Sequence, residues 1–300
     1  MNDYLTGFAE YLKNLKTSSA NTRDSYMRDV TAFTTFVSSK GCDSPTTVTE
    51  NLIYDYIDSL KEMGRSSTTV SRNVSSIRCY YKYLIFSGIA SSNPAKDIKL
   101  DHVDKKLPQV LSGDEINLLL SQPDVSTAKG CRDKAMLELL YATGIRVSEL
   151  INLDVQDVNL QGALLNCKGS KGARQIPIYT SAVVAVSDYI YRMRRILIDD
   201  ESNQALFVNR NGTRLTRQGF WKIIKGYAAS AGIKTELTPH TLRHSFAIHL
   251  LENGASVKDI QQIMGHADIS SMHVYVQLMD QHVKQVYDEC HPKANDRRVR

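Results

Sequence analysis

The sequence of 300 residues has few cysteines, and they do not form the pattern of a disulfide framework or a metal site. Their number is odd, and no two have the short spacing of metal ligands; they are Cys42, Cys79, Cys131, Cys167 and Cys290. Scattered cysteines of this kind are typical of a reduced, intracellular protein. We therefore expect a cytoplasmic protein, and its hydrophobic fraction of 42% is sufficient for real cores.

Long apolar runs are also missing, and charge of one sign does not dominate. No apolar run approaches the 18 residues of a transmembrane helix, and the first residues, "MNDYLTGFAEYLKNL", include acids and lack the apolar core of a signal peptide. The net charge of +5 is mildly basic and is spread along the chain. Such a charge permits nucleic-acid binding but does not argue for it alone.

The first hundred residues have the apolar periodicity of helices. Three stripes recur at helical spacing, after a first segment from Tyr4 to Leu15: Tyr26 to Val37, Ile53 to Leu60 with Thr49 as a cap, and Val70 to Leu84 before Gly88. They predict about four helices in a small bundle. The third stripe carries Arg72, Arg78 and Lys82 on its other faces, which would either be solvated or lie against DNA phosphates.

Two prolines and a charge run interrupt this periodicity near residue 100. We interpret residues 1–96 as a helical domain, 97–107 as a linker and 108–300 as a second domain. The second domain begins with a capping box, in which Ser112 and Glu115 start a helix. Another helix is expected from Arg132 to Thr143, ending at Gly144.

Short β-like runs follow in the second domain. "ALLNC" and "RQIPIY" flank the turn "KGSKGA" and predict a hairpin, and "ALFVN" is a further candidate strand. The remaining periodic segments are helical, near residues 182–197, 217–231, 242–253, 257–264 and the end of the chain. The fold class is therefore mainly α with a small antiparallel β-sheet (α+β).

Several charged residues of the second domain stand beside glycines or helix ends. Arg146 follows the expected end of a helix at Gly144, and Glu149 stands three residues later. Lys168 and Lys171 lie in the glycine-rich turn. Each has an ordinary structural interpretation, as a surface ion pair or as turn chemistry.

A second group of such residues opens a helix and follows a glycine. The segment "TPHTLRHSF" supplies His240 and Arg243, and "IMGHADISSMHVYVQL" supplies His266 and Tyr275. The spacing of His240 and His244 could bind zinc, but there is no H-E-x-x-H motif and no third ligand at a recognised spacing. The P-loop sequence is also missing, so a phosphate-cradling loop of that kind is excluded.

Taken in order, these residues resemble the signature of the tyrosine recombinase (phage-integrase-like) family, R…K…H-x-x-R…H…Y. Here the signature is Arg146, Lys168, His240, Arg243, His266 and Tyr275. The flanking "LLYATGIRVSELINL" and "HTLRHSFAIHLLENGASVKDIQQIMGHADIS" are similar too, and the chain length is that of the Xer branch. Cys167 stands where the family commonly has glycine, which leaves Lys168 and Lys171 both open as the catalytic lysine.

The resemblance implies that the chain cleaves and rejoins double-stranded DNA at a specific site through a 3′-phosphotyrosyl intermediate and a Holliday junction. Two arginines suit the charge that builds on the non-bridging oxygens, with His266 as a third donor. Tyr275 would be the nucleophile, His240 its base, and a lysine the general acid. Glu149 would orient Arg146 or His266. Lys171 would be a further DNA contact.

The resemblance also implies partners and leaves other functions open. We expect no metal and no cofactor, a homo- or hetero-tetramer on paired sites, and a role such as chromosome dimer resolution during cell division, on the nucleoid. A mobile-element integrase or resolvase, a type IB topoisomerase-like enzyme and a DNA-binding protein without catalysis are the alternatives. An apolar stripe from Val276 to Tyr287 predicts a last helix, which packs either on its own domain or on a neighbouring protomer.

Overall fold

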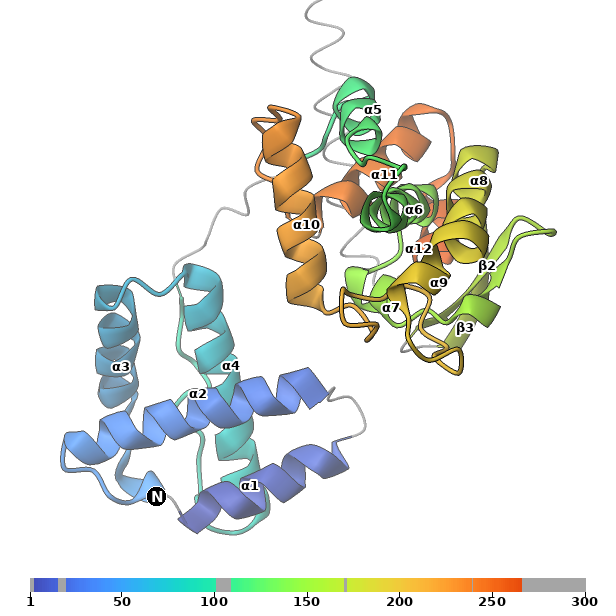
Figure 1. Ribbon diagram of the computed structural model, residues 1–300. Helices are drawn as coiled ribbons and strands as arrows, with labels where there is room; N and C mark the ends of the chain where they lie inside the picture. The colour runs from blue at the N-terminus through green and yellow to red at the C-terminus, as the bar shows by residue number, and fades with distance from the viewer. Residues whose placement is uncertain (1–2, 16–19, 101–108, 170–171, 239, 266–300) are drawn as a thin grey trace, which may run out of the picture. The chain divides into compact units, whose positions relative to one another are not determined.

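The computed structural model describes residues 3–15, 20–100, 109–169, 172–238 and 240–265. It divides the chain into two compact units, Met1–Lys105 and Lys106–Arg300. Both units are shown in Figure 1. The expected last helix lies outside the described residues.

The first unit is a small helical bundle, as the apolar stripes predicted. Its α-helices are α1 (Asp3–Asn14), α2 (Ala20–Ser39), α3 (Glu50–Glu62) and α4 (Ser67–Phe86), with a short 3₁₀ helix η1 (Pro45–Thr47) before α3. Helix α2 packs on both α1 and α4 (Figure 1). The Thr49 hydroxyl caps α3 by accepting a hydrogen bond from the Leu52 amide, which confirms the predicted start of that helix.

The core of the first unit continues past the predicted domain boundary at residue 96. Ala95 and Ile98 are buried against the bundle. The Arg78 guanidinium on α4 donates hydrogen bonds to the carbonyls of both residues, at 2.8 and 2.7 Å. The chain around these two residues is therefore packed, although it was predicted to begin a linker at 97. Residues 101–107 of that segment lie outside the described residues.

The second unit is built around helix α6 (Ala128–Thr143). Figure 1 shows α6 nearly end-on, with other helices around it. Both faces of α6 are buried, which is the pattern of a helix that forms the centre of a core. The surrounding helices are α5 (Gly113–Ser121), α7 (Val147–Ile151), α8 (Thr180–Asp188), α9 (Arg194–Leu197), α10 (Arg217–Ser230), α11 (Thr241–Glu252) and α12 (Val257–Met264).

A three-stranded antiparallel sheet lies at one edge of the second unit. Its strands are β1 (Val158–Asn159), β2 (Leu164–Gly169) and β3 (Gly172–Pro177), in the order β1-β2-β3. Strands β2 and β3 form the predicted hairpin, with Lys168 opposite Ala173 and Gly169 opposite Gly172. The 3₁₀ turn η2 (Val155–Asp157) precedes β1. The mainly α fold with a small antiparallel sheet is thus confirmed.

One local prediction in the second unit was wrong. "ALFVN" is not a strand: Ala205 and Val208 each form only an isolated bridge, with Asp154 and Arg214. Its apolar residues Leu206 and Phe207 are fully buried, so the run reflects burial and not strand pairing. The helix expected over 182–197 is confirmed, and it contains a π-helical turn, η3 (Tyr189–Met193), between α8 and α9.

The predicted capping box is confirmed. The Ser112 hydroxyl accepts from the Glu115 amide, and the Glu115 carboxylate accepts from the Ser112 amide.

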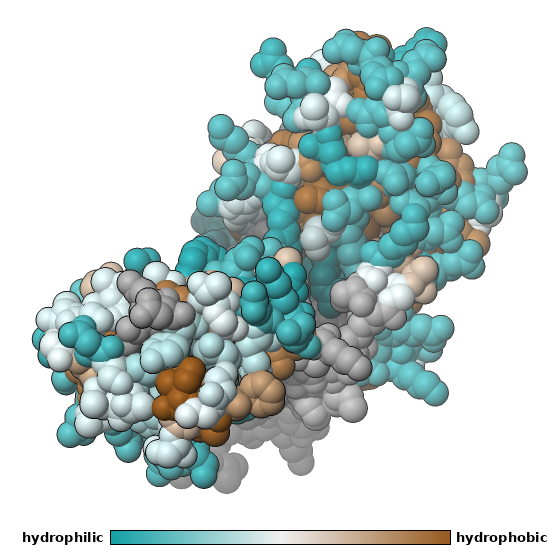
Figure 2. All heavy atoms as spheres, turned by 90° about the horizontal axis from the view of Figure 1, so that it is seen from below, coloured by the Kyte–Doolittle hydropathy of each residue, from teal (hydrophilic) through white to brown (hydrophobic). Residues whose placement is uncertain are grey.

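Most of the surface in the view of Figure 2 is hydrophilic. Among the helices that the structure describes, none combines the length and hydropathy needed to cross a bilayer.

Candidate active site

Arg146 stands at the start of α7, three residues after the end of α6. Gly144 ends α6 in the left-handed conformation, with φ of 57°. A side chain there would also overlap the Phe246 ring of α11. Both the backbone conformation and the lack of space therefore require glycine at this position. This tight turn brings Arg146 to the N-terminus of α7 with its side chain 40% exposed. Arg146 is therefore anchored at its backbone and still accessible to a ligand.

Glu149 binds both the backbone and the side chain of Arg146. Its carboxylate accepts a hydrogen bond of 2.8 Å from the Arg146 amide and one of 3.3 Å from the Arg146 guanidinium. Glu149 is only 8% exposed. The carboxylate thus satisfies the first turn of α7 and holds the guanidinium beside it.

Arg174 on β3 also binds this carboxylate, and sequence reasoning missed it. Its Nη1 and Nη2 atoms donate to the two oxygens of Glu149, at 3.1 and 3.0 Å. A signal for this residue was present, because Arg174 alternates with the buried Ile176 and Ile178 on the inward face of the strand. An arginine on an inward face needs an acidic partner or carbonyls.

The pKa of Glu149 lies below its ordinary value despite the burial. Desolvation is the largest single influence and would raise this pKa. Hydrogen bonds from Arg174 and from the Arg146 amide, together with the charges of both arginines, outweigh it. Glu149 is therefore an anion at neutral pH.

Arg243 on α11 is buried and lies between the ends of two other helices. Its side chain is 3% exposed. One terminal nitrogen donates to the Gly144 carbonyl at the end of α6, and the other donates to the Met264 carbonyl, 2.8 Å away, at the end of α12. Cations are favourable at helix C-termini, where carbonyls lack intrahelical partners. Arg243 therefore links two turns. One lies between α6 and Arg146, and the other ends α12 just before His266 in the sequence.

His240 stands at the start of α11 among these cations. Desolvation, followed by the charges of Arg243, Arg146 and Arg217, lowers its pKa below the ordinary 6.5. The imidazole is therefore neutral at pH 7, which is the form that can accept a proton. Arg217, the first residue of α10, is a further cation near His240 that sequence reasoning did not select.

Lys168 lies on β2 next to the hairpin turn and is not directed at this cluster. Its Nζ atom is 3.2 Å from the Asp157 carboxylate, and its side chain is 69% exposed. The neighbouring Cys167 points inward and is fully buried. Burial, followed by the charge of Glu149, raises the pKa of the Cys167 thiol to about 11. The thiol is therefore protonated and lies close to the carboxylate.

The structure thus brings together Arg146, Glu149, His240 and Arg243, and adds Arg174 to them. It places Lys168 beside Asp157 instead. Three other predicted site residues lie outside the described residues, namely Lys171, His266 and Tyr275.

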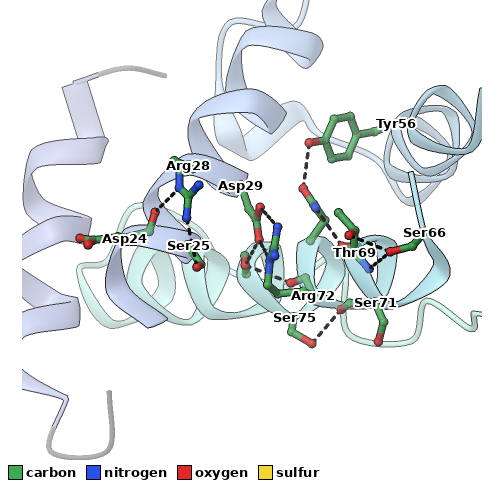
Figure 3. A network of polar contacts seen from close by, with 12 residues as sticks. Asp24, Ser25, Arg28, Asp29, Tyr56, Ser66, Thr69, Ser71, Arg72 and Ser75 are labelled. Atoms are coloured by element: carbon green, nitrogen blue, oxygen red, sulfur yellow. Dashed lines mark hydrogen bonds and ion pairs between the residues drawn. The ribbon is translucent and has the colours of Figure 1, made fainter. Parts of the chain in front are cut away.

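The basic residues predicted on α4 have different surroundings. Arg72 and Asp29 point toward one another from α4 and α2 (Figure 3). The guanidinium donates to both oxygens of the buried carboxylate, at 2.8 and 2.9 Å, and remains 46% exposed. Arg78 is held by the carbonyls of Ala95 and Ile98, whereas Lys82 is exposed. A DNA contact by any of them remains a prediction.

The two histidines considered for zinc are near one another but have no third ligand in this part of the fold. The ring centroids of His240 and His244 are 6.0 Å apart. Within the described ranges, no three histidine, cysteine, aspartate or glutamate side chains are grouped so that they could hold a metal ion.

Both units match known families. Residues 5–88 match the "Phage integrase, N-terminal SAM-like domain", and residues 109–282 match the "Phage integrase family". The second match spans more than half of the chain and includes all the residues of the candidate site.

Similar proteins and solved structures agree with this match. The tyrosine recombinase XerD of Oceanobacillus iheyensis is 44% identical over 293 residues, covering 96% of this chain and 97% of that protein. XerD of Listeria innocua is 40% identical over 298 residues, covering 98% and 100%. A crystal structure of XerH bound to palindromic difH substrate, a post-cleavage complex, has a TM-score of 0.75 at 19% identity and covers 95% of this chain and 84% of that one. At that identity the structural match shows the fold. The chain belongs to the phage integrase family of tyrosine recombinases, on its Xer branch.

Proposed function

We propose that this chain is a site-specific recombinase that cleaves and rejoins DNA through Tyr275. The observation that carries the proposal is the cluster of Arg146, Arg243 and a neutral His240, in which the anionic Glu149 holds Arg146. Two guanidiniums suit the charge that builds on the non-bridging oxygens when a phosphodiester is attacked. Names and titles of the relatives, which include recombinases bound to DNA, support the same reaction.

The proposed reaction has two steps, cleavage and rejoining, and rejoining is chemically the reverse of cleavage. The Tyr275 oxygen attacks phosphorus and its proton passes to His240, while the 5′-oxygen leaves with a proton from Lys168. This step forms a 3′-phosphotyrosyl ester, and attack by a 5′-hydroxyl on the ester reverses it. Because the ester keeps the bond energy of the phosphodiester, the reaction needs no ATP. Fixed guanidiniums supply the charge stabilisation, so we propose that it needs no metal ion.

Domain roles and assembly belong to the same proposal. The first unit would clamp DNA, with the exposed Lys82 and the partly exposed Arg72 as contacts. A homo- or hetero-tetramer would hold two sites and pass through a Holliday junction, with Lys171 as a further DNA contact. Glu149 would keep Arg146 in place. We place this enzyme in the cytoplasm on the nucleoid, in chromosome dimer resolution at cell division.

Covalent capture from genomic DNA tests the reaction and the biological role together. The purified chain is incubated in excess EDTA with sheared genomic DNA of its source organism, and DNA that stays bound through denaturing washes is sequenced. We expect one short recurrent site from the wild-type chain and none from Tyr275→Phe. Recovery only when Mg²⁺ is present would contradict the metal-free step.

The position of the recovered site distinguishes the alternatives. A single chromosomal locus supports chromosome dimer resolution, whereas the ends of an integrated element support a mobile-element integrase. Attachment to DNA without sequence preference would instead support a type IB topoisomerase-like enzyme.

A further inference from the structure

Arg174 joins three separate elements of the second unit through a single guanidinium. Besides its two bonds to Glu149, its Nε atom donates to the carbonyl of Ile263, 2.8 Å away on the last turn of α12. The side chain is 15% exposed. The Nε, Nη1 and Nη2 atoms of the guanidinium therefore all have partners. These partners lie on α7 and α12, whereas Arg174 itself lies on the hairpin.

The carbonyls at the end of α12 are held by two arginines. Arg174 binds the Ile263 carbonyl, and Arg243 binds the next one, that of Met264. These carbonyls lie in the last turn, which has no continuing helix to satisfy it. Gly265 then ends the helix in the left-handed conformation, with φ of 65°. The next residue in the sequence is His266.

Two glycines lie close to the Arg174 guanidinium. A Cβ atom on Gly265 would lie 2.9 Å from the Cζ and Nη1 atoms of Arg174. A Cβ atom on Gly169 would lie 3.0 Å from Nη1 and 3.0 Å from the Glu149 carboxylate. Two glycines from two different elements thus allow close contact with the ion pair.

We propose that Arg174 is a positioning residue for DNA cleavage, which holds the end of α12 on the carboxylate that orients Arg146. It thereby fixes the end of α12 at Gly265, the residue before His266 in the sequence, relative to Arg146. The inference rests on the proposed function. Lysine could not replace Arg174, because only a planar fork donates in two directions to a carboxylate and in a third to a carbonyl.

A single-turnover cleavage assay with saturating DNA tests the role of Arg174. A nicked substrate carrying the captured site traps the covalent adduct, and its rate of formation is measured. We expect Arg174→Lys to lower this rate about 10²-fold, since a displacement of about 1 Å in a catalytic group costs that much. Its Kd for DNA should stay as in wild type. The matched control is Arg194→Lys, which removes a buried guanidinium bound to the carbonyls of Asn203 and Ala205.

A double-mutant cycle separates positioning from general destabilisation. If Arg174 acts through His266, Arg174→Lys should slow the already impaired His266→Ala variant by less than about threefold. A general loss of folded structure would slow both backgrounds by the same factor.

A glycine pair provides a second test that leaves Arg174 in place. Gly265→Ala introduces a methyl group against the guanidinium, whereas Gly232→Ala introduces one into open space at the same φ of 65°. We expect slow cleavage for Gly265→Ala and nearly wild-type cleavage for Gly232→Ala in the folded protein.

Three results would overturn the inference while the wild-type chain still forms its adduct. They are unchanged cleavage in Arg174→Lys, equal slowing in the presence and absence of His266, and equal rates for the two glycine variants. If the wild-type chain forms no adduct with any genomic DNA, the proposed function itself fails, which is a different outcome.

Discussion

Replacing Glu149 by glutamine should weaken both folding and cleavage, because one carboxylate serves two arginines. It accepts from Arg174 at both oxygens and from the Arg146 amide, and it is 8% exposed. Removing one partner of a buried ion pair leaves an uncompensated charge, at a cost of about 3–5 kcal/mol. Glutamine keeps one acceptor oxygen but turns an amide donor toward a guanidinium. We therefore expect a loss of about 3 kcal/mol in the free energy of unfolding.

The pH dependence of that loss follows from the lowered pKa of Glu149. Because the pKa in the folded protein lies below the ordinary value of 4.5, the stabilisation is complete above pH 4.5. This stabilisation is lost as the pH falls through the pKa that Glu149 has in the folded protein. The difference in the free energy of unfolding between wild type and Glu149→Gln should therefore be constant from pH 7 to about 5 and become smaller below pH 4.5.

Urea unfolding at several pH values and the single-turnover assay measure these effects. The control is Glu138→Gln, which changes another buried carboxylate of the same unit, bound to Lys134 and Tyr179 and away from the site. Both variants should lose stability, but only Glu149→Gln should cleave about 10²-fold more slowly in its folded fraction. Equal cleavage by the two variants, or a stability difference that widens below pH 4.5, would refute the reasoning.

Three further expectations concern other parts of the site. Gly144→Ala should lower the free energy of unfolding by about 3 kcal/mol in urea, from strain at positive φ and overlap with Phe246; a loss below about 0.5 kcal/mol would contradict this. A substrate with sulfur in place of the 5′ bridging oxygen should restore cleavage to Lys168→Ala; rescue of Lys171→Ala instead would identify that lysine as the general acid. The cleavage rate should be level near pH 7 and fall only below about pH 6.5, since His240 has a lowered pKa, and a decline that begins above pH 7 would exclude His240 as the base.

Apolar periodicity and end signals were sufficient to predict most of the helices. The Thr49 cap, the capping box of Ser112 and Glu115, and the glycine after α6 all have the predicted geometry. These signals are local, because each depends on hydrogen bonds within a few residues. The hairpin was predictable for the same reason, from two β-like runs around a glycine-rich turn.

The failures lie where distant segments meet. Buried Leu206 and Phe207 have the composition of a strand, but no strand among the described residues pairs with them. The Asp29 partner of Arg72 is 43 positions away, and Arg78 binds the carbonyls of Ala95 and Ile98, on either side of the predicted domain boundary. No local pattern contains such pairings.

The sequence was sufficient to select several residues of the site, but not to predict their contacts. The structure brings together the predicted residues Arg146, Glu149, His240 and Arg243. The two carbonyls that Arg243 binds, those of Gly144 and Met264, are 120 positions apart in the chain, so no local pattern relates them. Arg174 was visible only as an arginine on the inward face of a strand.

The most direct test of the central claim is to find which residue carries the DNA. The chain has 15 tyrosines, so an adduct alone does not identify the nucleophile. The trapped adduct is digested with nuclease and trypsin, and the peptide that carries the phosphate is sequenced by mass spectrometry. We expect one modified peptide, with the phosphate on Tyr275 and its 3′-nucleotide attached, and no adduct from Tyr275→Phe. Phosphate on any other residue, or an adduct that persists in Tyr275→Phe, would contradict the account.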